Sequence, residues 1–458
     1  MFTKVLVANR GEIAVRLIQT LAEMGIQSVA VYSTADKHAL HVKLADESVC
    51  IGPPRATDSY LNMRNVVSAA VLTGADAVHP GFGFLSENAD FAELCEQAGI
   101  CFIGPSASSI RQLGDKAVAR QTAAALGVPV IPGSDELPNV EYAVAWSRDH
   151  GFPLLIKAAG GGGGKGIRLV HDEAELVAQF VRTKAEATAT SGNASLYLEK
   201  VISPAKHVEV QVVGDQAGHV WVFPERDCSL QRNKQKILEM SPSLQMTAEQ
   251  REQLQQLAYK ITRGTKYVNA GTIEFLQDEA GAFYFMEMNT RIQVEHPVSE
   301  LVTGIDLLAT QIRVAAGVDL PGGNRNIAPR GVAIECRINA EDPLHGFAPA
   351  AGKVRNVTWP LGGNGVRIDS GITAGDDISP FYDSMVAKLI ASAPDAQQAW
   401  VRIARMLSQF HVSGVPTTRG LLHDLVRDET VQAGAASTEY LTTEWLPDWL
   451  DKSEEASI

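Results

Sequence analysis

The first hundred residues alternate between short apolar runs and a helical pattern, and this alternation restricts the fold more than any other feature. Residues 5–8 and 28–32 have the composition of buried strands, and residues 11–24 between them carry apolar side chains at helical spacing. Strand-like runs return at residues 75–78 and 100–103. Strands that alternate with helices form a parallel sheet with helices on both faces. The sequence therefore predicts an α/β fold, α+β overall, that begins with a Rossmann-like parallel sheet.

The turn after the first predicted strand does not have the sequence of a dinucleotide site. It contains Asn9, Arg10, Gly11 and Glu12. It therefore lacks the GxGxxG pattern, in which glycines let the backbone approach a pyrophosphate closely. An oxidoreductase that binds a dinucleotide at this turn is accordingly disfavoured.

Length, charge and cysteine content exclude several classes of protein. The chain has 458 residues, which at about 150 residues per domain predicts roughly three domains. A formal charge of −13 disfavours nucleic-acid binding. No apolar run approaches the ~18 residues of a membrane span. Five scattered cysteines without CxxC spacing, and an N-terminus unlike a secretory signal, predict a cytoplasmic protein.

Changes in sequence character divide the chain into regions. Residues 1–113 form the alternating N-terminal domain, and residues 114–330 mix helical segments with alternating strands. Residues 331–446 begin with a strand and end with amphipathic helices, and residues 447–458 form a tail. We expect these regions to be three domains.

The glycine run 160–164, followed by Lys165 and Gly166, is the strongest local signal. A Walker A loop would have Ser or Thr in place of Gly166 and a helix after it. Here predicted strands flank the run, which favours a glycine hairpin whose backbone N–H groups fold over phosphates. A flexible turn without function is the alternative, but it would not need so many glycines.

Two later strands carry acidic residues at strand spacing. If the chain stays extended, Glu287, Asn289, Arg291, Gln293 and Glu295 share one face. Carboxylate and amide oxygens are the ligands that Mg²⁺ prefers. A solvated sheet face is the alternative, but the dense apolar neighbours favour burial, and buried carboxylates need partners. The segment therefore predicts a metal site, with Glu274 from the preceding strand.

Other polar segments are ambiguous when each is taken alone. The cationic segment 225–236 is better explained as an exposed loop, and Cys228 within it as a packed side chain, because no histidine there can activate a thiolate. Lys116 and Lys157 would each be ordinary solvated lysines, although Lys157 precedes the glycine run. The loop at residues 79–88 is either a ligand loop at a strand end or an aromatic plug between domains.

Taken together, these segments resemble the biotin carboxylase family of ATP-grasp enzymes. The resemblance runs almost from end to end, through residues 8–14, the glycine run, and residues 287–297, 335–343 and 382–385. It implies an N-terminal biotin carboxylase domain, an ATP-grasp domain whose glycine-rich flap subdomain covers about 131–204, and a C-terminal biotin carboxylase domain. No Met-Lys-Met attachment motif is present, which implies that biotin arrives on a separate carrier protein.

The resemblance also implies a reaction and partners. ATP and bicarbonate would give carboxyphosphate, whose carboxyl group passes to N1′ of biotin. This is the first half-reaction of acetyl-CoA carboxylase in fatty acid synthesis. Mg²⁺ or Mn²⁺ would accompany ATP. The implied partners are a biotin carboxyl carrier protein, carboxyltransferase subunits and a second copy of the chain.

The site residues of the family carry over by position. The nucleotide would be held by Lys116, Lys157, Gly163, Gly164, Glu199, Lys200, Val201, Ile202, His207, Gln231, Lys234, Lys236, Glu274 and Glu287. The metal would be held by Glu274, Glu287 and Asn289. Bicarbonate would be held by Lys236, Arg291, Gln293 and Val294, and deprotonated by Glu295. Biotin would contact Phe82 and Arg337, with Arg337 stabilising its enolate-like oxygen.

Four positions depart from the family pattern. Lys234 stands where a histidine is usual, Phe82 where tyrosine is common, and Gln19 and Asn364 replace residues associated with the dimer interface. Two other functions stay open: an ATP-grasp ligase for a different carboxylate, and a catalytically silent scaffold subunit. The intact Glu295 and the other implied catalytic residues argue against both.

Overall fold

The N-terminal part is a parallel sheet, as the alternation predicts. The computed structural model describes residues 1–158, 167–191 and 195–455. The sheet order is β3–β2–β1–β4–β5, and every pair is parallel. Its strands are β1 (Lys4–Val7), β2 (Gln27–Ser33), β3 (Glu47–Gly52), β4 (Ala77–His79) and β5 (Cys101–Phe102). Its helices are α1 (Gly11–Glu23), α2 (Leu40–Leu44), α3 (Met63–Thr73) and α4 (Ala89–Gln97).

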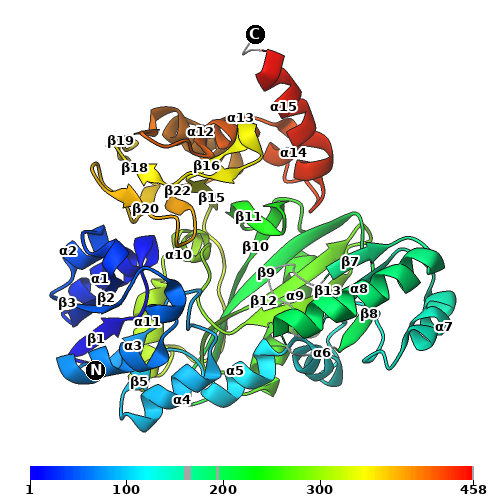
Figure 1. The fold of residues 1–458 in the computed structure, drawn as a ribbon, viewed down its shortest axis with the longest axis horizontal. Coiled ribbons are helices and arrows are strands. Elements are labelled where there is room, and N and C mark those ends of the chain that lie inside the picture. Colours follow the sequence, from blue (N-terminus) through cyan, green and yellow to red (C-terminus); the bar gives the residue numbers. More distant parts are fainter. Residues whose placement is uncertain (159–166, 192–194, 456–458) are drawn as a thin grey trace.

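A large central sheet lies beside this N-terminal part (Figure 1). Its order is β13–β12–β9–β10–β11–β15–β22–β20, with β14 pairing to β10. The strands are β9 (Ala205–Gly214), β10 (Val220–Arg232), β11 (Gln235–Ser241), β12 (Asn269–Asp278), β13 (Phe283–Asn289), β14 (Arg325–Asn326), β15 (Val332–Asn339), β20 (Val366–Ser370) and β22 (Met385–Ala393). Because β11 pairs with β15, one sheet runs across residue 330.

Helices and short strands complete the fold around these sheets. The remaining helices outside the C-terminal region are α5 (Ala107–Gly114), α6 (Lys116–Ala125), α9 (Ala248–Gly264), α10 (His296–Thr303) and α11 (Leu307–Ala315). The short strands are β16 (Glu341–Asp342), β17 (Ala348–Pro349), β18 (Gly352–Lys353), β19 (Asn356–Thr358), β21 (Asp377–Ile378) and β23 (His411–Ser413). None of the helices in the described chain is long and apolar enough to cross a membrane.

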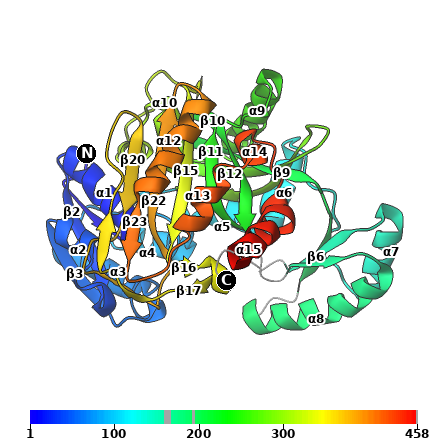
Figure 2. The same cartoon turned by 90° about the horizontal axis from the view of Figure 1, so that it is seen from above.

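A small unit projects from one side of the central sheet (Figure 2). It contains β6 (Leu154–Ala158), β7 (Ile167–Val170), β8 (Leu196–Lys200), α7 (Val140–His150) and α8 (Glu173–Ser191). Its apolar side chains form a core of their own. The pair β6 and β7 is antiparallel, as the hairpin prediction requires, but the glycine run between them lies outside the described residues.

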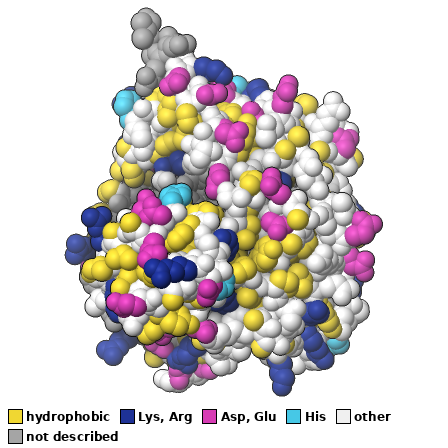
Figure 3. Space-filling model, turned by 90° about the vertical axis from the view of Figure 1, so that its right-hand side faces the viewer, with side chains coloured by type: hydrophobic (Ala, Val, Ile, Leu, Met, Phe, Trp, Pro, Cys, Tyr) yellow, Lys and Arg dark blue, Asp and Glu magenta, His cyan; other side chains and the backbone are white. Residues whose placement is uncertain are grey.

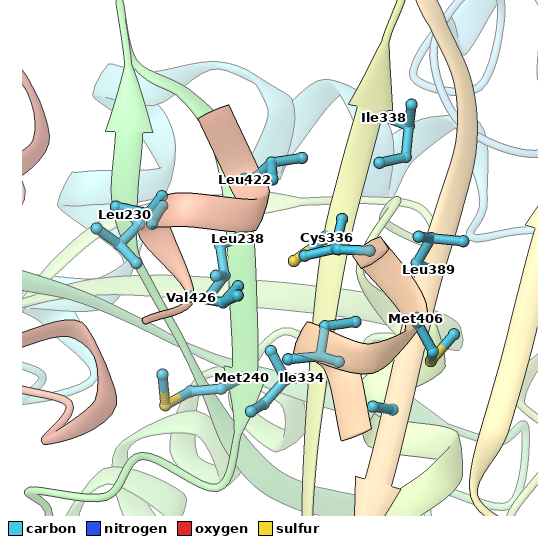
Figure 4. Close-up of a cluster of buried hydrophobic side chains, with 14 of the residues drawn as sticks. Leu230, Leu238, Met240, Ile334, Cys336, Ile338, Leu389, Met406, Leu422 and Val426 are labelled. Carbon is cyan, nitrogen blue, oxygen red and sulfur yellow. The ribbon is translucent and has the colours of Figure 1, made fainter. Parts of the chain in front are cut away.

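The two faces of β11 and β15 have opposite characters. Leu238, Met240, Ile334 and Cys336 pack into an apolar core with the C-terminal helices (Figure 4). These helices are α12 (Ala396–Gln409), α13 (Arg419–Leu425), α14 (Glu429–Gln432) and α15 (Leu446–Glu455). Residues of the alternate parity, among them Arg337, lie on the other face. The strand period therefore supplies a core on one side and a polar wall on the other.

One face of the molecule shows how its charged side chains are distributed. On the face drawn in Figure 3, lysine and arginine side chains are scattered among acidic and apolar ones. A nucleic-acid binder would instead gather its basic side chains on one face or stripe. This view shows no such gathering among the side chains that the structure describes.

Candidate active site

A cavity of about 1140 Å³ collects side chains from the N-terminal sheet, the central sheet and the C-terminal region. Most of the predicted site residues line it. They are Phe82, Lys116, His207, Lys234, Lys236, Glu274, Glu287, Asn289, Arg291, Gln293, Val294, Glu295 and Arg337. The fold thus brings together residues that are more than 250 positions apart in the sequence.

The extended face predicted to run from Glu287 to Glu295 is wrong beyond Asn289. Strand β13 ends at Asn289, and Glu295 is the N-cap of α10 with φ −82° and ψ 12°. Pro297 lies in the first turn of α10, where its missing N–H costs nothing and its fixed φ favours a helix start. The chain therefore turns, and Glu295 reaches the cavity from a helix end rather than from a strand.

Lys236 is the centre of the charged cluster at the cavity wall. Its Nζ lies 2.5 Å from Glu209 Oε2, 2.5 Å from Glu295 Oε1 and 3.2 Å from Glu274 Oε1. Burial by itself would lower the pKa of Lys236, but these carboxylates outweigh burial and raise it well above the ordinary value. Lys236 is therefore a permanent cation at neutral pH.

His207 is a second cation in this cluster. Its Nε2 lies 3.3 Å from Glu274 Oε2, and Gln231 Nε2 lies 3.1 Å from its Nδ1. Burial would lower the pKa of His207, but Glu274 and Glu209 raise it to about 9. His207, Glu209 and Glu274 are close enough to hold a metal ion, but the ammonium of Lys236 already bridges the two carboxylates.

The predicted metal ligands lie on neighbouring strands. Glu274 on β12 is the register partner of Glu287 on β13, so both side chains leave the same face. Asn289 Nδ2 donates to Glu274 Oε1 at 2.9 Å, and Lys116 Nζ lies 2.5 Å from Glu287 Oε2. Three oxygen donors with no sulfur or nitrogen ligand fit Mg²⁺. In this structure each of the two carboxylates pairs with a lysine, Glu287 with Lys116 and Glu274 with Lys236.

The interpretation of residues 225–236 as an exposed loop is wrong. They form the end of β10 and the start of β11, and Arg226 has no exposed surface. Arg226 Nε donates to Glu209 Oε1 at 2.6 Å, and its Nη2 donates to Gln293 Oε1 at 2.9 Å. Local composition cannot reveal such burial, because the partners come from β9 and from the segment before α10.

Cys228 is a packed side chain, as predicted. It is fully buried, and burial raises the pKa of its thiol well above the ordinary value, with the Glu209 charge adding to the effect. A thiol that stays protonated is a poor nucleophile. Cys228 therefore contributes packing under the charged cluster.

The loop at residues 79–88 is part of the site rather than a plug alone. Glu87 Oε2 accepts from Arg291 Nε at 2.9 Å, and Glu87 Oε1 accepts the Thr290 N–H at 3.1 Å. Asn9 donates to the carbonyl of Phe82 at 2.7 Å. The loop thus holds Arg291 and is itself held by the turn after β1. Sequence reasoning missed Glu87, Glu209 and Arg226.

Some predicted nucleotide residues do not line this cavity. These are Lys157, Glu199, Lys200, Val201, Ile202 and Gln231. Lys157 on β6 pairs with Glu199 on β8. Gly163 and Gly164 lie outside the described residues, so their predicted role stays a prediction.

Comparison with known proteins decides the family. Family models match residues 1–110 (biotin carboxylase, N-terminal domain), 115–322 (carbamoyl-phosphate synthase L chain, ATP binding domain) and 335–443 (biotin carboxylase C-terminal domain). The chain is 50% identical to biotin carboxylase 1 of Bacillus subtilis over 97% of its length and 99% of that protein. The chain belongs to the biotin carboxylase family.

A 2-oxoglutarate carboxylase from one organism supplies a further similar sequence and a similar solved structure. The 2-oxoglutarate carboxylase small subunit of Hydrogenobacter thermophilus is 48% identical over 96% of this chain and 93% of that protein. A crystal structure of the biotin carboxylase domain dimer of that organism's 2-oxoglutarate carboxylase, with MgADP, ADP and bicarbonate, matches with a TM-score of 0.92. Sequence identity is 48%, over 96% of this chain and 97% of that one.

Family membership establishes the class of reaction. The chain is an ATP-dependent ligase, a biotin carboxylase that uses ATP and Mg²⁺ and acts on biotin carried by a separate protein. The fold class predicted from the sequence is confirmed as well: a parallel N-terminal sheet, an ATP-grasp domain and a C-terminal biotin carboxylase domain.

Proposed function

We propose that this biotin carboxylase forms carboxyphosphate in the cavity, with Glu295 as the base that deprotonates bicarbonate. The observation that carries the proposal is the position of Glu295 between two cations. Its Oε1 lies 2.5 Å from Lys236 Nζ, and its Oε2 lies 3.0 Å from Arg337 Nη2. Cations placed in this way stabilise the negative charge that spreads over the γ-phosphoryl group during transfer.

The first step consumes ATP. A bicarbonate oxygen attacks the γ-phosphorus, the bond to ADP breaks, and the bicarbonate proton passes to Glu295. Burial would raise the pKa of Glu295, but Lys236 and Arg337 outweigh burial and lower it. Glu295 is therefore ionised before bicarbonate arrives, and bicarbonate then competes with it for both cations. A positioned base of this kind contributes about 10²–10⁴-fold.

Bicarbonate is proposed to lie beside Lys236, Arg291, Gln293 and the backbone of Val294. All four line the cavity next to Glu295. Lys388 Nζ donates to the Val294 carbonyl at 2.9 Å, which fixes this part of the backbone. Arg291 is held by Glu87 and Asn289, so its guanidinium is already oriented before substrate binds.

The nucleotide is proposed to lie between the cavity and the small unit around β6. Three lysines from different parts of the chain support this, namely Lys116, Lys157 and Lys234. Burial lowers the pKa of Lys234, and the charges of Lys157 and Lys116 lower it further. Such convergent cations favour a polyphosphate. The other proposed contacts are the flap glycines Gly163 and Gly164, Glu199, Lys200, Val201, Ile202, His207 and Gln231. Glu274, Glu287 and Asn289 would hold Mg²⁺ or Mn²⁺, which neutralises charge on the phosphates when bound.

The second step transfers the carboxyl group. Carboxyphosphate breaks its C–O bond to release phosphate, which takes the N1′ proton of biotin, and N1′ forms a bond to the carboxyl carbon. Arg337 is proposed to stabilise the biotin oxygen, and Phe82 to contact the ring system. Phe82 lines the cavity from the loop at residues 79–88, which Asn9 holds.

Glu295→Gln tests the role of the base. We expect kcat for biotin-dependent ADP release to fall by about 10²–10⁴-fold, because the amide cannot accept the bicarbonate proton. The assay is ADP release from Mg-ATP with bicarbonate and biotin, together with transfer of bicarbonate label to biotin. Glu279→Gln, an exposed change in the turn before β13, is the matched control. Near-normal turnover of Glu295→Gln would contradict the proposal.

The acyl acceptor of the complete enzyme is proposed to be acetyl-CoA, in fatty acid synthesis, with carboxyltransferase subunits as partners. Support comes from the relatives named as biotin carboxylases, but the 2-oxoglutarate relative is almost equally similar. Purifying the chain with its bound partners and supplying acetyl-CoA, pyruvate or 2-oxoglutarate with labelled bicarbonate tests this. Label on a keto acid rather than on acetyl-CoA would overturn it.

We also propose a homodimer, a cytoplasmic location and domain boundaries at residues 113, 330 and 446. The dimer follows from the related domain dimer, and Gln19 and Asn364 are the positions where this chain departs from the family's interface. Sedimentation of the purified chain measures the dimer.

If the chain binds carrier but never turns over, with free biotin or with a biotinylated carrier, the scaffold alternative replaces the proposed catalysis.

A further inference from the structure

The guanidinium of Arg337 lies between two carboxylates from different elements. Its Nε donates to Glu239 Oε1 at 2.5 Å, and its Nη2 donates to Glu295 Oε2 at 3.0 Å. Glu295 lines the cavity, whereas Glu239 on β11 lies behind Arg337 and has no exposed surface. Among the described residues, Nη1 of Arg337 makes no hydrogen bond, so it is the donor left for a ligand.

A second buried carboxyl group accompanies Glu239. Glu335 on β15 is its register partner, so the two side chains leave the same face, with β carbons about 4.5–5.5 Å apart. Neither oxygen of Glu335 has a hydrogen-bond partner among the described residues, and Oε2 of Glu239 has none either. An ionised carboxylate without partners is costly in a protein interior. Of the pair, Glu239 is therefore the member that carries charge, because Arg337 contacts it.

The charged surroundings of Glu239 come from several elements. The titratable or charged groups that interact with it are Arg337, Glu335 and Cys336 on β15, Glu295 at the start of α10, Lys236 on its own strand and Cys228 on β10. Burial raises the pKa of Glu239, Arg337 opposes this, and the result is about 7. Burial raises the pKa of Glu335 well above its ordinary range.

We propose that Glu239 is a positioning residue that holds Arg337 on the cavity wall, so that the guanidinium is shared between Glu239 and Glu295 and keeps Nη1 available for biotin. When Glu239 is neutral, Arg337 pairs with Glu295 alone. The ionised form of Glu295 is then stabilised more strongly, and the guanidinium of Arg337 moves away from β11. The proposal rests on the roles proposed above for Glu295 and Arg337.

The direction of the pH effect follows from the charge on Glu239. As the pH falls through about 7, Glu239 takes up a proton and its contact with Arg337 loses its charge assistance. Biotin carboxylation should therefore fall on the acid side of neutrality. Glu239→Gln mimics the protonated form at every pH. Its activity should therefore be low throughout, and its pH profile should lack the fall on the acid side that titration of Glu239 causes.

The experiment uses the full-length chain and measures ADP release from pH 6 to 9, with bicarbonate, in the presence and absence of biotin. For Glu239→Gln we expect kcat with biotin to fall by about 10-fold at alkaline pH, as for other residues that orient a functional group. The KM for ATP should not change. Glu335→Gln is the matched control, because it places the same amide on the neighbouring strand and leaves the Arg337 contact intact; its kcat should equal that of the wild type.

Each outcome decides the matter. Wild-type kcat and an unchanged pH profile in Glu239→Gln would overturn the proposal, and so would a reduced kcat that keeps the wild-type acid limb, since that indicates general structural damage. If Glu239→Gln does not fold, Glu239→Asp replaces it, because this variant keeps the charge. Its kcat should be reduced while the acid limb of its pH profile is retained. Loss of the acid limb in Glu239→Asp would overturn the proposal. A wild-type chain without bicarbonate-dependent ADP release would instead refute the proposed function.

Discussion

At the scale of single residues, His79 couples the stability of the site loop to pH. Its ring is fully buried at the end of β4, and its Nδ1 accepts the Gly81 N–H at 3.0 Å. Burial lowers the pKa of His79 from about 6.5 to about 3. Below about pH 6.5 this histidine binds a proton in the unfolded chain but not in the folded chain, so the free energy of unfolding decreases as the pH falls.

We therefore expect the free energy of unfolding to drop between pH 7 and pH 5 by about 2 kcal/mol more in the wild type than in His79→Asn. Asparagine can still accept from Gly81 but does not titrate. Urea unfolding at the two pH values measures the difference. His38→Asn, an exposed histidine on the same domain, should leave the drop unchanged. Equal drops in wild type and His79→Asn would contradict the assignment.

At the scale of elements, the hairpin between β10 and β11 carries strain at its tip. Asn233 and Lys234 both have positive φ, 50° and 65°, the backbone of a turn that suits the right-handed twist of paired strands. Asparagine tolerates this conformation, whereas it costs lysine about 1 kcal/mol. Lys234 lines the cavity, so the strain places a cation in the proposed nucleotide site.

Lys234→Gly should therefore raise the free energy of unfolding by about 1 kcal/mol while raising the KM for ATP. Urea unfolding and initial rates with varied ATP measure the two effects. Asn233→Gly is the control, with a smaller gain in stability and no change in KM. A less stable Lys234→Gly variant, or one with an unchanged KM, would show that this explanation of the turn is wrong.

At the scale of the whole molecule, the central sheet and the small unit around β6 are built differently. The central sheet runs without a break from β13 to β20, across residue 330. The small unit buries its own core of apolar side chains, among them Leu154, Ile156 and Leu198. Units with separate cores open separately. The architecture therefore predicts two levels of local stability in one chain.

Hydrogen exchange can measure this difference. Without nucleotide, amides of β6 and β8 should exchange faster than those of β9 and β12, and MgADP should slow β6 and β8 most, because the proposed site lies against them. The amides of β22, an interior strand of the central sheet that carries none of the proposed nucleotide contacts, are the internal reference. Equal protection of both sets without nucleotide would show that the two units unfold together.

Prediction from the sequence was effective where the signal was local. The parallel sheet follows from apolar runs at residues 5–8 and 28–32, since strand and helix periods can be read directly. The pairing of Glu274 with Glu287 follows similarly from two strands joined by a short turn. The extended face failed beyond Asn289, because a helix start at Pro297 overrides strand parity.

By itself, the sequence determined the strand and helix periods, the hairpin around the glycine run and the family, because each depends on neighbouring residues or on motifs in order. Only the tertiary structure decided that Arg226 and Glu239 are buried, that Glu87 holds Arg291, and that Lys236 joins carboxylates from three elements. The reason is physical: a buried charge is stable only beside its partners, and here those partners lie on strands and loops far away in the chain.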